Sequence, residues 1–116
     1  MHFAFEIGVA KAKAVESNGE FIVKAQSLAR AEVTPSMPPT YRALRQQLTA
    51  DGALQPKDSQ TLVFARDVPF TSPTAAACVV YGASISGPGN WYVEGTSQTY
   101  AEIRQRALQA AEAAVE

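Results

Sequence analysis

Apolar residues alternate with polar or small residues at the start of the chain, which is the period of a strand with one buried face. The apolar face of this first strand consists of Phe3, Phe5, Ile7 and Val9. From Lys11 onward, alanines occupy the even positions and longer side chains the odd ones, so the phase of the pattern changes. The change of phase predicts a bulge or a break near Gly8.

A hairpin is predicted at Asn18 and Gly19, because both residues tolerate positive φ and stand between two strand-like runs. This turn sets the cross-strand pairs Glu16–Phe21, Val15–Ile22, Ala14–Val23 and Lys13–Lys24. Lys11 then shares a face with Lys13 and Lys24. Like charges directly opposite one another destabilise a sheet by a few tenths of a kcal/mol. The face is therefore either fully solvated, which also protects an edge strand from aggregation, or it meets an anionic partner such as phosphate.

A helix is predicted from about residue 39 to residue 51, with a glycine stop at Gly52. Its apolar positions recur at Tyr41, Leu44 and Leu48. Arg42 and Arg45 are three residues apart, so they are expected near each other on the helix surface. They are either solvated helix charges or a pair that binds a ligand.

The stretch from Phe70 to Gly82 contains a helix start, a run of small residues and a helix stop. Ser72 suits the N-cap position and Pro73 the first helical position. Gly82 suits the end of the helix. A helix this short is not stable without tertiary packing, and its alanines allow close approach, so it is predicted to be the core element around which the other segments gather.

Two further strands are predicted at residues 61–65 and 91–93. Thr99 and Glu102 form a capping box at the start of a last helix over residues 99–115. The apolar stripe of this amphipathic helix consists of Tyr100, Ile103, Ala107, Leu108, Ala111 and Val115. The helix is expected to cover the open sheet or, alternatively, to pair with another subunit.

These elements predict one α+β domain over residues 1–116. It has an antiparallel sheet of three to five strands, starting with an N-terminal hairpin and packed with two short helices and a longer C-terminal helix. A chain of 116 residues, of which 47% are hydrophobic, is long enough for one core and too short for two domains of ordinary size.

The charge and the cysteine content exclude several classes of protein. A formal net charge of −1 and a pI of about 5.8 provide no global positive field for sequence-independent nucleic-acid binding, so any such binding must be local. A single cysteine, Cys78, excludes an intrachain disulfide and a multi-cysteine metal site. The chain has no apolar run of about eighteen residues and no basic and apolar leader, so we expect a cytoplasmic protein.

Residues that could carry chemistry are sparse. His2 is the only histidine and stands beside the initiator, so no histidine-based acid–base pair or triad is available. Cys78 has no histidine in a folded segment to activate it and is interpreted as a small buried hydrophobe. Four acids near turns are interpreted as turn and cap residues: Asp51, Asp58, Asp67 and Glu94. No catalytic residue, metal ligand or cofactor is assigned, and an enzyme is not expected.

The small-residue helix carries a recognisable motif. The run F-T-S-P-T-A-A-A at residues 70–77, then G-A-S at 82–84, a glycine and a tryptophan resemble the domain of unknown function 4357 family, whose pattern runs F-S-S-P-S-A-A-A, G-x-S-x-N-G and W. The motif positions are Phe70, Ser72, Pro73, Ala75, Ala76, Gly82, Ser84, Gly87 and Trp91. The resemblance covers residues 12–100, and there is a more distant similarity to the domain associated with restriction enzymes and adenine methylases.

The resemblance implies a prokaryotic accessory domain, often attached to GIY-YIG nucleases and suspected of helping them to contact nucleic acid. This chain departs from the family pattern at three positions. Ser86 stands where the family has asparagine, Tyr92 where a lysine often follows the tryptophan, and Gln26 where a glycine commonly ends the second strand.

Two functions remain open. The first is a non-catalytic binding module for DNA or RNA, acting through Lys11, Lys13, Lys24, Arg42 and Arg45, with Trp91 available to stack on a base. The alternative is a protein-interaction or self-association module acting through the last helix, with a nuclease, another protein or a second copy as partner and a monomer or weak homodimer as the state in solution. Salt distinguishes them, because phosphate contacts weaken steeply with ionic strength and an apolar helix interface does not.

Overall fold

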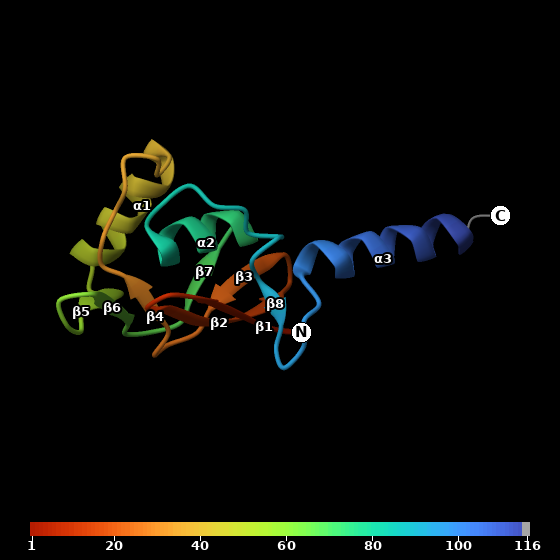
Figure 1. Ribbon diagram of the computed structural model, residues 1–116, viewed down its shortest axis with the longest axis horizontal. Coiled ribbons are helices and arrows are strands. Elements are labelled where there is room, and N and C mark those ends of the chain that lie inside the picture. Colours follow the sequence, from red (N-terminus) through yellow and green to blue (C-terminus); the bar gives the residue numbers. More distant parts are fainter. Residues whose placement is uncertain (115–116) are drawn as a thin grey trace.

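The computed structural model describes residues 1–114, which form eight strands and three helices (Figure 1). The strands are β1 (His2–Ile7), β2 (Ala10–Ser17), β3 (Glu20–Val23), β4 (Leu28–Arg30), β5 (Leu54–Pro56), β6 (Thr61–Phe64), β7 (Val68–Phe70) and β8 (Tyr92–Val93). The helices are α1 (Pro39–Ala50), α2 (Pro73–Tyr81) and α3 (Tyr100–Ala114). The α+β class predicted from the sequence is confirmed.

All eight strands belong to one antiparallel sheet, in which β2 is central. The order is β5-β6-β4-β2-β1-β8, and β3 pairs with both β2 and β7. The predicted hairpin is confirmed, because Asn18 and Gly19 have φ values of 51° and 80°. Its register is also the predicted one, with the pairs Ala14–Val23, Val15–Ile22 and Glu16–Phe21.

The predicted break near Gly8 is a second tight turn. Gly8 has a φ of 58°, and β1 folds back on β2 over its whole length, so that Phe3 lies opposite Ala14 and Phe5 opposite Ala12. In an antiparallel pair, residues that face each other point to the same side, so odd positions in β1 and even positions in β2 share the buried face. The change of phase is therefore what a hairpin with one buried face requires.

The sheet has more strands than the three to five predicted. The missed strands are β4, β5 and β7, each only three residues long. Three residues are too few for alternation to show, and β7 also contains Pro69, which argues against a central strand. These segments are strands because a neighbour pairs with them: β7 lies along β3, with Pro69 opposite Ile22.

α2 is the core helix that the sequence predicted, and it covers one face of the sheet (Figure 1). The hydroxyl of Ser72 accepts a hydrogen bond from the N–H of Ala75 at 3.0 Å, and Gly82 ends the helix with a φ of 75°. All residues from Ala75 to Val80 are buried. The large side chains of the core beneath them are Phe3, Phe5, Phe21, Val23, Phe64 and Trp91.

The C-terminal helix does not cover the sheet, which corrects one of the two expectations for it. Its capping box is confirmed, with Glu102 N–H donating to Thr99 Oγ1 and Thr99 N–H to Glu102 Oε1, both at 3.1 Å. α3 then projects from the body (Figure 1), and the molecule measures 54 × 28 × 24 Å. Among the described side chains of α3, only Tyr100 in the first turn is buried and only Ile103 is half-buried. Val115 lies outside the described residues.

Candidate functional site

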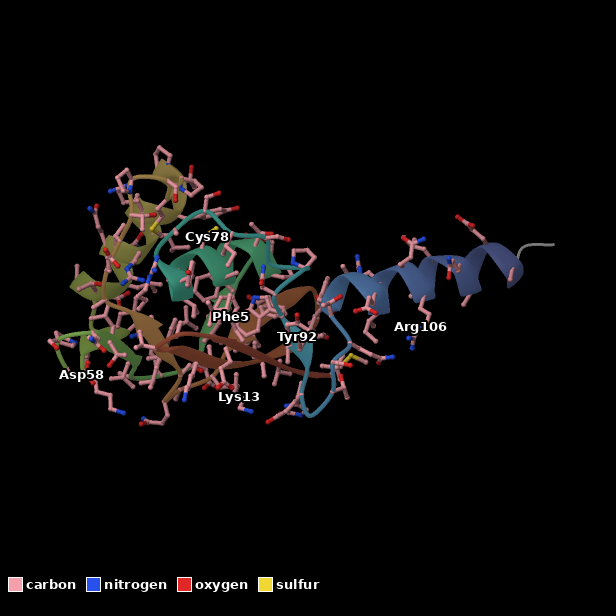
Figure 2. All side chains as sticks on the ribbon, in the orientation of Figure 1. Phe5, Lys13, Asp58, Cys78, Tyr92 and Arg106 are labelled. Carbon is pink, nitrogen blue, oxygen red and sulfur yellow. The ribbon has the colours of Figure 1, made fainter. Side chains whose placement is uncertain are left out.

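The three lysines of the proposed phosphate contact lie on the face of the sheet away from α2. Figure 2 shows Lys13 pointing away from the helices, whereas Phe5 points toward α2. The predicted adjacency of the two hairpin lysines is confirmed by a hydrogen bond of 2.9 Å from Lys24 N–H to Lys13 O. Lys11, Lys13 and Lys24 are all exposed, so this face is accessible to a partner.

Each of these lysines has a carboxylate beside it. The distances from lysine Nζ to the nearest carboxylate oxygen are 2.7 Å for Lys13–Glu94, 2.6 Å for Lys24–Asp67 and 3.9 Å for Lys11–Glu6. Each of the three lysines is thus paired with one carboxylate, so these pairs leave no excess positive charge on this face. Contact with phosphate stays a prediction, and it requires the phosphate to displace carboxylates.

The ion pairs change the acidity of their carboxylates. The hydrogen bond from the Lys24 side chain, together with the N–H of Ala25 at 2.8 Å, holds the pKa of Asp67 below its ordinary value of 3.8. In the same way, the side chain of Lys13 lowers the pKa of Glu94 below 4.5. Both carboxylates are ionised at neutral pH and offset the repulsion that the hairpin imposes on its two neighbouring lysines.

Arg45 is buried rather than on the helix surface where the sequence placed it, with 4% of its area exposed. Its guanidinium donates to the carbonyl oxygens of Val79, Arg30 and Ala31. The last carbonyls of a helix have no intrahelical partner, and Arg45 supplies donors to that end of α2 and to β4 as well. Burial, with a smaller contribution from Arg30, lowers the pKa of Arg45 to about 10, so it stays charged at neutral pH.

Arg42 is half-buried and borders, with Arg45, a groove of about 450 Å³ between α1 and the chain around Ala31 and Leu62. Its Nη2 donates to the carbonyls of Thr34 at 3.2 Å and Met37 at 3.4 Å. The sequence drew attention to the arginine pair but not to the groove, because the opposite wall comes from residues distant in the chain. The arginines are on the helix side of the sheet and the lysines on the open side, so the predicted set does not form one surface.

Trp91 belongs to the core. Its side chain is 0% exposed, its Nε1–H donates to Pro73 O at 3.0 Å, and its ring lies 5.3 Å from that of Phe5 and 4.9 Å from that of Phe21. No face of the ring is free to stack on a base in this structure. The tryptophan thus packs against β1 and β3 through its ring and binds the start of α2 through its N–H.

The motif residues hold α2 against its neighbours. A Cβ on Gly87 would lie 2.3 Å from the backbone of Pro73 and Thr74, and one on Gly82 would lie 2.2 Å from Glu32 O. The N–H of Ser84 donates to Ser36 Oγ at 3.3 Å. Among the other motif side chains on or beside α2, Phe70, Ala75 and Ala76 are buried, and Ser72 and Pro73 are half-buried. The motif is thus used for close packing of one short helix and presents no reactive group.

The three departures from the family pattern differ in their structural meaning. Gln26 has a φ of 76°, in the left-handed region that favours glycine, the residue that the sequence resemblance commonly places there. Ser86 lies in an exposed turn, where its hydroxyl accepts from Gly89 N–H at 3.2 Å and its carbonyl from Asn90 Nδ2 at 2.8 Å. Tyr92 is 39% exposed.

Two of the four acids have the roles expected of turn residues, whereas Asp67 and Glu94 pair with Lys24 and Lys13 instead. Asp51 Oδ1 accepts from Ala53 N–H at 2.9 Å, and Asp58 Oδ1 accepts from Gln60 N–H at 2.8 Å and Thr61 N–H at 2.9 Å. Cys78 is buried, and its thiol contacts Ile85 O at 3.6 Å. Within residues 1–114, no group of three or more potential ligands is placed to hold a metal ion, and no helix is long and apolar enough to cross a membrane.

A single antiparallel sheet with one closely packed helix and a projecting C-terminal helix defines a small α+β domain, in which the recurring motif serves the packing. The chain belongs to the family of the domain of unknown function DUF4357, whose family model matches residues 3–104. The match includes β1 and ends where α3 leaves the body. Comparisons with curated proteins and with solved structures give no match.

Proposed function

We propose that this protein is a non-catalytic association module that pairs with a second copy of itself through α3. The observation that carries the proposal is the exposure of this helix. From Arg104 to Ala113 every side chain is exposed, and Leu108 is 59% exposed. The exposed part begins at the last residue of the family match.

The exposed helix has a physical reason to find a partner. Isolated helices of about 12–15 residues or fewer are marginal in water. α3 has 15 residues, and among its described side chains only Tyr100 and Ile103 are buried or half-buried. A second helix packed along it would cover Leu108 and the alanines on the same stripe. Burial of this apolar surface would stabilise both helices.

The charges on α3 favour a second copy in the antiparallel orientation. Arg104 and Glu112 stand four residues before and four residues after Leu108. A two-fold axis through Leu108 therefore brings Arg104 of each copy to the level of Glu112 of the other copy. A two-fold interface must be self-complementary. The arrangement of Arg104 and Glu112 meets this requirement, because each positive charge lies level with a negative charge of the other copy. The parallel orientation would instead bring like charges together.

The contact is small, so the dimer is expected to be weak. A helix of 15 residues is about 22 Å long, and a pair of such helices with short side chains buries less than the roughly 1,200 Å² of a standard stable interface. We expect a dissociation constant between about 10 µM and 1 mM. Contact with nucleic acid has less support, because the exposed lysines that would bind phosphate are paired with carboxylates.

Sedimentation velocity over micromolar to millimolar concentrations tests the proposal. Leu108→Glu should give a monomer, and Arg104→Glu and Glu112→Arg should each weaken the dimer. The double variant should restore it, because the charges are exchanged symmetrically. Arg106→Glu is the matched control, since it makes the same charge change on the opposite side of α3 from Leu108.

Two results would overturn the proposal: a wild-type monomer at all concentrations, or equal weakening by Arg106→Glu and Arg104→Glu. Fluorescence anisotropy with labelled single- and double-stranded DNA and RNA, at low and moderate salt, tests the other hypothesis in parallel. Salt-sensitive binding that is lost in a Lys13→Glu, Lys24→Glu variant would favour nucleic acid.

A further inference from the structure

The groove beside α1 combines two guanidinium groups with an apolar wall. Arg42 and Arg45 come from one face of α1, and Val33 and Leu62 lie across from them. Val33 is 37% exposed, one of the large apolar side chains that the fold leaves accessible. α1 lies at the end of the molecule opposite α3 (Figure 1), so the groove is independent of the proposed dimer contact.

Within residues 1–114, the positive charges of the groove have no anionic partner. No acidic residue lines the groove, and the ion pairs found among residues 1–114 involve other cations, those of Lys11, Lys13, Lys24 and Arg66. The guanidinium of Arg45 is held by three carbonyls. Arg42 makes only the two bonds at 3.2 and 3.4 Å, which are long compared with the roughly 2.7–2.9 Å of bonds between a cation and a carboxylate.

The size and the lining of the groove suit a small ligand. Its volume of about 450 Å³ lies within the range of roughly 300–1,000 Å³ for small-molecule sites, which are mostly apolar with a few convergent polar groups. Both bonds of Arg42 come from Nη2, so the N–H groups of its Nε and Nη1 remain as donors for another acceptor. A carboxylate oxygen that accepts from one of these donors forms a charge-assisted hydrogen bond.

We propose that the groove binds a small amphipathic carboxylate, with its carboxylate group on the free N–H donors of Arg42 and its apolar body against Val33 and Leu62. Arg45 adds a second positive charge at short range, where partial burial strengthens the attraction. A carboxylate fits better than a phosphate, because the donors of Arg45 are largely engaged by carbonyls, which leaves few donors for the larger number of oxygens on a phosphate.

Titration of the ¹⁵N-labelled full chain with sodium octanoate, followed by two-dimensional NMR, tests this site. Saturable shifts should be confined to α1, residues 31–33 and the region of Leu62. Sodium acetate, 1-octanol and inorganic phosphate at equal concentrations should bind at least about tenfold more weakly, because each lacks either the apolar body or the carboxylate. Phosphate or octanol binding as tight as octanoate would overturn the proposed ligand class.

Two variants test the geometry. Arg42→Gln should weaken octanoate binding at least about tenfold, whereas Arg66→Gln, an exposed arginine outside the groove, should leave it unchanged. Ala50→Phe adds a ring at an exposed position that borders the groove and should weaken binding while both charges remain. Unchanged affinity in both Arg42→Gln and Ala50→Phe, or shifts centred elsewhere on the molecule, would overturn the proposal.

Discussion

At the scale of single residues, the stability of this domain depends on side chains whose roles are invisible in the local sequence. Arg45 is the clearest case, because it joins α1 to the end of α2 and to β4 through carbonyl oxygens. Arg30 acts nearby, stacking its guanidinium 4.0 Å from the ring centre of Tyr81 and donating to Tyr81 O at 2.7 Å. Both residues are charged, yet they stabilise the packing of backbone segments.

Replacing Arg45 with methionine keeps much of the apolar stem and removes the donors. The carbonyls that it satisfies would lose their bonds in a buried setting, so we expect the free energy of unfolding to fall on the order of 3 kcal/mol. Urea denaturation measures this, with Arg66→Met as a control that should change stability by less than about 0.5 kcal/mol. Equal effects of the two substitutions would show that the carbonyl bonds contribute nothing.

Gln26 should be a site where glycine stabilises the protein. Its φ of 76° costs a residue with a side chain about 1–2 kcal/mol, and Gln26→Gly relieves this at the expense of a more flexible unfolded chain. We expect a net gain of about 0.5–1 kcal/mol in thermal or urea unfolding. Gln47→Gly, at an exposed position in α1, should lose about 1 kcal/mol, and a loss at both positions would contradict the argument.

At the scale of elements, the close approach of α2 to its surroundings decides the fold. Gly82→Ala should be far more destabilising than Gly95→Ala, although both glycines have nearly the same φ, 75° and 78°. A Cβ at Gly82 would lie 2.2 Å from a backbone oxygen, whereas one at Gly95 would meet nothing within 4 Å. We expect losses of at least about 3 kcal/mol at Gly82 and about 1 kcal/mol at Gly95. Similar melting temperatures for the two variants would exclude the clash.

The hairpin ion pairs should make stability dependent on pH in acid. The folded-state pKa of Asp67 lies below the ordinary 3.8, so the folded state binds fewer protons than the unfolded state between the two values. The contribution of this pair is therefore present above pH 3.8 and lost as the pH falls through the lowered pKa. Asp67→Asn should flatten the fall in melting temperature below about pH 4, and a fall as steep as that of the wild type would contradict this argument.

At the scale of the whole molecule, the projecting helix sets the shape. The Cα radius of gyration is 14.7 Å, against about 13 Å for a compact chain of this length. If α3 pairs as proposed, the two bodies lie at opposite ends of the helix pair. Small-angle scattering at high concentration should then show an elongated particle well beyond the 54 Å length of the monomer. A compact dimer would indicate contact through the bodies instead.

The sequence predicted the elements whose signals are local. The Asn18–Gly19 turn, the Ser72 cap, the Gly82 stop and the Thr99–Glu102 capping box all appear where the residues indicated, because each depends on neighbours within four positions. The open lysine face was also accessible from the sequence, since the hairpin register places Lys13 beside Lys24. The carboxylates that neutralise these lysines could not be predicted, because Asp67 and Glu94 come from segments that are distant in the sequence.

By itself, the sequence determined the α+β class, the hairpin and the core helix, since local sterics and hydrophobic period decide these. Only the tertiary structure decided that three short segments complete the sheet, that Arg45 is buried and that α3 projects from the body. The physical reason is the same in each case: pairing, burial and exposure depend on which distant residues arrive alongside, and no local pattern records that. The groove beside α1 and the exposure of α3 beyond its first turn are likewise visible only in the tertiary structure.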